Sequence, residues 1–166
     1  MRIFLKIALI ISPYTLFGQS AREAIEFING KSNNGAHTIF SSSDEMREYS
    51  LIKFDGTVLH RIEIHKDRET KERFNPPKMS NYTSHLKYMN PFNVKVVEDS
   101  KDIFWIELNT TNSTRKVKVD YYGNLIMGKS IRLGPYRRSD EYNLEERLVK
   151  AASVAITHFG GKPDSF

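Results

Sequence analysis

The alternation of apolar and polar residues through the middle of the chain constrains the fold more than any other feature. From Arg115 to Tyr121, apolar or aromatic residues alternate with charged ones. This period of two is typical of a β-strand with one buried face. Similar runs extend from about residue 36 to residue 133, and turn residues such as Asp55-Gly56 separate them. The pattern predicts about seven strands, mostly in sequential antiparallel order.

A helix is predicted on each side of these strands. Apolar residues recur with the helical period over residues 21–28 and again over residues 144–159. Asn143 is a suitable cap for the second helix, and Gly160 is suited to end it. We therefore expect the short helix near the N-terminus and the long amphipathic helix near the C-terminus to pack on the sheet.

These elements predict an α+β fold built on a strongly bent antiparallel sheet or open barrel. The apolar stripe of the long helix is expected to be buried against Trp105, Ile106 and the valines of the strands. An antiparallel sheet that both helices cover on one face is the alternative arrangement.

Residues 1–20 have the pattern of a signal peptide. Two basic residues, Arg2 and Lys6, precede an apolar run, and small residues stand at Gly18 and Ser20. We expect cleavage after Ser20 or one or two residues earlier, which leaves residues 21–166 as a single α+β domain. The leader predicts a secreted or periplasmic protein, with no membrane span once it is removed.

Cysteine content and charge exclude several classes of function. The chain has no cysteine, so it has no disulfide, thiolate metal site or cysteine nucleophile. Loss of Arg2 and Lys6 with the leader would leave 23 basic and 20 acidic residues, a net charge of +3. This excess is too small to predict nucleic-acid binding.

Residues 66–92 do not follow the strand pattern. A charged stretch is followed by Pro76-Pro77 and then by Tyr82, His85 and Tyr88. A loop of this length without secondary structure is uncommon in a compact domain. We interpret the segment as an insertion: either a partly ordered surface excursion with a short helix, or a binding segment.

Basic residues on one strand face provide a second candidate binding surface. Lys116 and Lys118 share the exposed face of their predicted strand and could attract an anionic ligand, although solvated surface charges have the same pattern. The candidate ligand-binding residues are therefore Lys116, Lys118, Tyr82, His85 and Tyr88.

The segment Gly123–Ser130 matches the phosphate-loop pattern G-x-x-x-x-G-K-S. Such a loop requires a helix directly after it. Here the intervening residues are apolar and suited to a strand, and Gly134-Pro135 follows too soon for a helix. We therefore interpret the match as a coincidence and predict no nucleotide site.

No pattern in the chain predicts catalysis, a metal site or a cofactor. His60 and His65 are expected on opposite faces of one strand, so they cannot share a metal ion, and neither H-E-x-x-H nor G-x-S-x-G occurs. We expect His60 to be a hydrogen-bonded core or sheet-edge histidine.

The two ends of the chain resemble a group of small bacterial proteins. The closing segment, residues 146–166, contains E-R-x-x-K-A and then H-F-G-G-K-P-D-S-F, and the opening helix contains A-I-E-F-I-N. Together they resemble uncharacterised small secreted proteins of Bacteroidetes-type bacteria, which implies secretion and no established activity. The order of about seven strands and a closing helix is similar to that of pleckstrin-homology-like barrels.

The sequence therefore favours a secreted or periplasmic, non-enzymatic binding module. Its expected partner is an unknown protein or envelope component, and an anionic ligand is a further candidate. A hydrolase or a protein that handles lipid or anionic ligands is the alternative. A pocket with convergent polar groups around His60 or His85 would favour that alternative, and a filled interior would favour the interaction module.

Overall fold

The computed structural model describes residues 13–32, 37–40, 45–66, 70 and 72–165. In these ranges it has two α-helices and nine antiparallel strands, which confirms the predicted α+β class. The helices are α1 (Pro13–Lys31) and α2 (Leu144–His158). Short 3-10 turns occupy Leu86–Tyr88, Thr111–Ser113 and Arg138–Asp140.

The strands form two sheets rather than one closed barrel. The large sheet has the order β1-β2-β3-β4-β7-β8 and consists of β1 (His37–Phe40), β2 (Glu45–Ile52), β3 (Thr57–Lys66), β4 (Arg73–His85), β7 (Val117–Tyr121) and β8 (Asn124–Gly128). The small sheet has the order β5-β6-β9 and consists of β5 (Met89–Glu98), β6 (Ile103–Thr110) and β9 (Ser130–Arg137).

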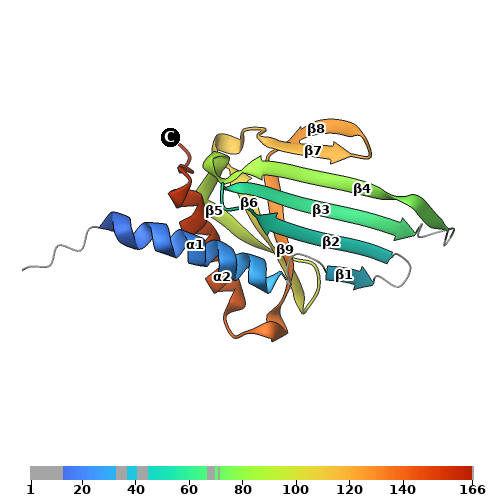
Figure 1. Ribbon diagram of the computed structural model, residues 1–166, viewed down its shortest axis with the longest axis horizontal. Helices are drawn as coiled ribbons and strands as arrows, with labels where there is room; N and C mark the ends of the chain where they lie inside the picture. Colours follow the sequence, from blue (N-terminus) through green and yellow to red (C-terminus); the bar gives the residue numbers. More distant parts are fainter. Residues whose placement is uncertain (1–12, 33–36, 41–44, 67–69, 71, 166) are drawn as a thin grey trace, which may run out of the picture.

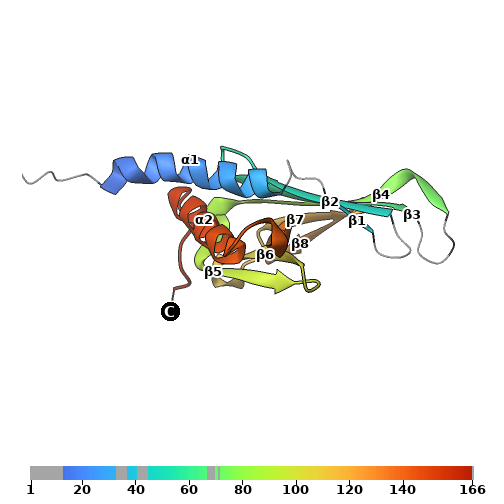
Figure 2. The same ribbon diagram turned by 90° about the horizontal axis from the view of Figure 1, so that it is seen from below.

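The small sheet covers only part of the large one. In Figure 1 the strands of the small sheet cross behind β2, β3 and β4 at a steep angle. Figure 2 shows α2 and the small sheet on the same side of the large sheet, whose far end extends beyond both. Contacts join α2 to α1 and to β5, and join β9 to β2. The inner face of the large sheet therefore meets β9 part-way along its strands.

The apolar stripe of α2 lies in the core, as the sequence predicts. Its buried residues are Leu144, Leu148, Ala151, Ala152, Ala155 and Ile156. They belong to one cluster with Ile106 and with Ile25 and Ile28 of α1. Trp105 is also buried, at 5% exposed, but it lies outside this cluster, contrary to the expectation. Successive side chains of a strand point to opposite faces, so Trp105 shares the other face of β6 with Glu107.

The ends of the helices differ from the expectation in detail. The first helix is longer than predicted and runs through the expected cleavage region. Of the side chains from Ser20 onward, Ala21 is the first that is buried. The signal peptide stays a prediction, and residues 1–12 lie outside the described ranges. Asn143 precedes α2 in a left-handed conformation and makes no capping side-chain bond.

The interpretation of residues 66–92 as an insertion was wrong. Residues 73–85 form β4, which pairs with β3 on one side and β7 on the other. The inward positions of β4 carry Ser80, Tyr82 and Ser84 instead of aliphatic residues. The apolar alternation that reveals a half-buried strand is therefore missing from this segment. Within the described ranges, no helix has both the length and the apolar character needed to cross a membrane.

Candidate functional site

A pocket of about 330 Å³ lies between the two sheets. The large sheet contributes Glu48 of β2, His60 and Ile62 of β3, and Tyr82 of β4. The small sheet contributes Glu107 of β6 and Ser130, Ile131 and Arg132 of β9. This volume is within the range of small-molecule sites, and polar side chains converge on it from five strands.

Strand register brings these side chains together. Glu48 is paired with Ile62 across β2 and β3, and His60 is paired with Tyr82 across β3 and β4. Directly paired residues of neighbouring strands project from the same face. On the small sheet, Glu107 is paired with Arg132 across β6 and β9. The crossing of β9 over the large sheet then places the large-sheet residues of the pocket opposite Glu107 and Arg132 of the small sheet.

A buried contact between Glu48 and His60 forms part of the pocket wall. The Nε2 atom of His60 is 2.9 Å from Oε1 of Glu48, and the two side chains are 3% and 6% exposed. A carboxylate only accepts hydrogen bonds, so Nε2 carries the hydrogen and Nδ1 becomes an acceptor in that tautomer. Among the described residues, Nδ1 has no hydrogen-bond partner. A buried acceptor without a hydrogen-bond partner lowers the stability of the folded state by about 1–3 kcal/mol.

Tyr82 adds a protonated hydroxyl beside this pair. Its ring centroid is 5.4 Å from that of His60. Burial raises the pKa of the Tyr82 phenol, and the negative charge of Glu48 raises it further. The Tyr82 hydroxyl therefore keeps its proton to a higher pH than an ordinary tyrosine does, and it can both donate and accept a hydrogen bond.

Arg132 supplies a positive charge on the small-sheet side of the pocket. Its Nε is 3.9 Å from Oε2 of Glu107, and its side chain is 47% exposed. Its guanidinium also lies 5.9 Å from the ring centroid of Trp105. An exposed ion pair this long contributes about 1 kcal/mol or less, so a ligand anion can compete for Arg132. Trp105 therefore lies in contact with a residue that lines the pocket.

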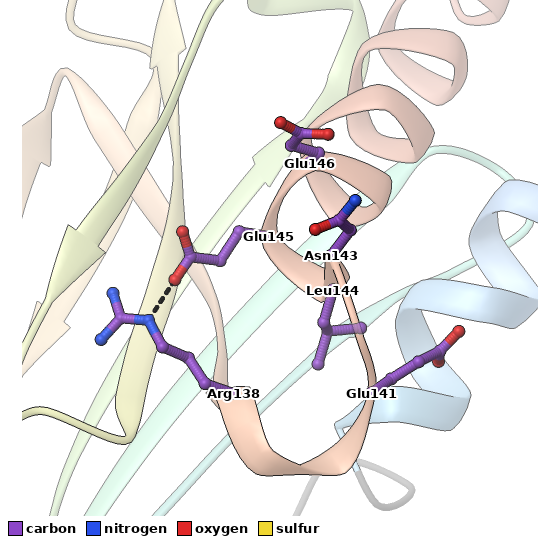
Figure 3. A pocket seen from close by; sticks show the side chains of 6 residues that line it. All are labelled: Arg138, Glu141, Asn143, Leu144, Glu145 and Glu146. Atoms are coloured by element: carbon purple, nitrogen blue, oxygen red, sulfur yellow. Dashed lines mark hydrogen bonds and ion pairs between the residues drawn. The ribbon is translucent and has the colours of Figure 1, made fainter.

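A second pocket, of about 250 Å³, lies at the start of α2 (Figure 3). Arg138 faces Glu145 there, and that hydrogen bond raises the pKa of Arg138. Glu141 points toward α1 and pairs with Lys31 and Arg147. Most of the charged groups of this pocket are thus already paired, and they join the segment that follows β9 to both helices.

The structure separates the five ligand-binding residues proposed from the sequence. Tyr82 lines the pocket between the sheets. Lys116 lies 5.6 Å from the ring centroid of Tyr88, and the rings of Tyr88 and His85 are 6.4 Å apart. Lys118 is paired with Thr83, so it projects from the face of the sheet opposite to Tyr82. Lys116, Tyr88 and His85 form a separate surface group.

The segment Gly123–Ser130 spans a turn, β8 and the first residue of β9. Gly123 is in the turn with a φ of 87°, and Gly128 is in β8, where an added Cβ would lie 3.4 Å from Val119. An extended strand follows Ser130, whereas a phosphate loop is followed by a helix.

Sequence reasoning missed Glu48, Glu107, Ser130 and Arg132 as functional candidates. His60 is a buried sheet histidine whose Nε2 contacts Glu48, in agreement with the predicted hydrogen-bonded core or sheet-edge histidine, and His65 lies near Glu63 on the other face. A charged residue at an inward position, such as Glu48 between Met46 and Ser50, was the available signal.

In the described part of the chain, no three metal-ligating side chains form a group. Comparisons with protein-family models, curated proteins and solved structures found no match.

Proposed function

We propose that this chain is a secreted or periplasmic binding module that holds a small polar molecule in the pocket between its two sheets. The compartment is inferred from the signal-peptide pattern of residues 1–20. The ligand site is inferred from one observation: His60, on the wall of the pocket, has a buried Nδ1 acceptor without a described partner. Buried polar atoms in native proteins are nearly always paired, and a ligand would supply the missing donor.

The pocket residues indicate the chemistry of this ligand. Nδ1 of His60 requires a donor such as a hydroxyl or an amine. Arg132 favours an anionic oxygen, and Ser130 and Tyr82 can complete the hydrogen bonds. We therefore propose a small hydroxylated or aminated anion. A pocket with convergent polar groups at His60 favours the ligand-handling alternative over the interaction module. Binding of a protein or envelope partner stays a prediction.

Trp105 provides a direct assay, because it is the single tryptophan of the chain and contacts Arg132. Titration with hydroxy acids, amino acids and sugar acids should change its fluorescence for at least one class. Replacing His60 with Leu should then weaken binding of that class by about 2- to 150-fold, the range that corresponds to loss of a hydrogen bond with a neutral or a charged donor.

His65→Leu is the matched control, since His65 lies on the same strand but on the opposite face. It should bind the ligand as the unmodified protein does. Equal affinities for His60→Leu and His65→Leu, or no response to any of the three classes, would reject the proposed site.

A further inference from the structure

Strand β8 has an unusual composition for the edge of a sheet. It ends the order of the large sheet, and among the described residues β7 is its one strand neighbour. Figure 1 shows it on the outer edge, beyond β7. Leu125, Ile126 and Met127 are 69%, 57% and 40% exposed there.

Apolar side chains project from both faces of this strand. Leu125 and Met127 are paired with Asp120 and Lys118, on the outer face of the sheet, whereas Ile126 is paired with Val119 on the inner face. Residues 124–128 contain no charge and no proline, the residues that usually protect an exposed edge from pairing. Continuous apolar sequence is typical of strands whose two faces are both covered, and an unprotected apolar edge strand is a template for pairing with another chain.

We propose that β8 pairs with β8 of a second copy of this chain, antiparallel and about a two-fold axis at Ile126. This register places Ile126 opposite itself, Leu125 opposite Met127, and Asn124 opposite Gly128 of the second copy. No like charges face each other along the paired strands. The two large sheets then become one continuous sheet.

Charges at the ends of the strand favour a second copy over an unrelated strand. In the same register, Lys129 lies opposite Gly123 of the second copy. The Gly123 N–H donates to Oδ1 of Asp120 at 2.9 Å, so a carboxylate is fixed at that turn. Lys129 and Asp120 are both exposed. Lys129 of each copy therefore approaches Asp120 of the other copy, and the two-fold axis places one such pair of opposite charges at each end of the interface.

Cysteine cross-linking tests both the pairing and its register, because the chain has no cysteine of its own. Residues directly opposite each other in antiparallel strands have Cα atoms about 4.5–5.5 Å apart, which suits a disulfide. Ile126→Cys should therefore give a covalent dimer under mild oxidation. Leu125→Cys is the matched control: it is at least as exposed but faces Met127, and it should cross-link at least about tenfold more slowly.

Sedimentation analysis of the full domain from about 1 µM to about 1 mM supplies the second readout. The unmodified protein should change from monomer to dimer, and Ile126→Lys should weaken the dimer at least about tenfold by placing like charges opposite each other. Phe92→Lys, a change at an exposed residue of β5, should leave dimerisation unchanged. A monomer at every concentration, or equal cross-linking of the two cysteine variants, would overturn the proposal.

Discussion

Replacing Glu48 and His60 separately and together should separate the stability of the fold from the function of the pocket. The two side chains are almost completely buried, and Nε2 of His60 is 2.9 Å from Oε1 of Glu48. His60→Leu leaves the Glu48 carboxylate buried without its partner, which should cost about 3–5 kcal/mol. Glu48→Leu leaves the Nε2 hydrogen of His60 unpaired, which should cost about 1–3 kcal/mol.

The double variant Glu48→Leu/His60→Leu should be more stable than His60→Leu alone. Both unpaired groups are removed, and replacing both partners of a buried polar pair with apolar residues of similar volume is often neutral or stabilising. We therefore expect a coupling energy of at least about 2 kcal/mol in the double-mutant cycle. Urea denaturation followed by far-ultraviolet circular dichroism measures all four unfolding free energies. Ligand binding should be lost in the double variant although the fold is kept.

Strictly additive effects, with a coupling energy below about 0.5 kcal/mol, would refute the reasoning. That result would mean that the two side chains do not interact in solution. Such a pair could not position His60 for a ligand.

Three further predictions concern the core, Tyr82 and two turn glycines. Leu148→Asp should unfold the domain, because it places a charge at a fully buried position of α2 and the net stability of a domain is about 5–15 kcal/mol; a melting curve by circular dichroism tests this, with exposed Lys150→Asp as the control. Burial raises the pKa of Tyr82, so the folded state holds this proton more tightly than the unfolded state. Its contribution to stability is present below pH 10 and is lost as the pH rises through the folded value, and Tyr82→Phe should remove one late-titrating phenol from an ultraviolet absorbance titration. Gly56→Ala should lower the unfolding free energy by about 1–3 kcal/mol, because the φ of Gly56 is 83° and an added Cβ would lie 2.8 Å from His85 and Phe159. Gly123→Ala is the control in the same urea denaturation assay: the φ of Gly123 is 87°, but no atom lies within 4 Å of an added Cβ, so the loss of stability should be smaller.

Local patterns predicted the elements whose buried faces are apolar. The alternation at residues 115–121 predicted β7, and the helical period over residues 144–159 predicted α2 to within one residue. Strand β4 was missed because its inward residues, including Ser80 and Ser84, are small and polar. A hydrophobicity pattern contains no signal for a strand of this kind.

The pocket could not be predicted from these patterns, because it depends on how the two sheets cross. His60 and Tyr82 were each noted in the sequence, but their partners across the pocket, Glu107 and Arg132, come from strands of the other sheet. Period and turn signals fix neighbours within a sheet and not the place where one sheet meets another. The same limit explains why Trp105 was expected to pack against the apolar stripe of α2.

The most direct test of the central claim is nitrogen-15 NMR of the histidine side chains during titration with the ligand found by Trp105 fluorescence. We predict that His60 has its hydrogen on Nε2 and that its Nδ1 resonance shifts as the pocket fills, because a ligand donor then bonds to that atom. The resonances of His65, on the opposite face, should stay unchanged. A ligand that saturates the protein without moving the Nδ1 resonance of His60 would contradict the account.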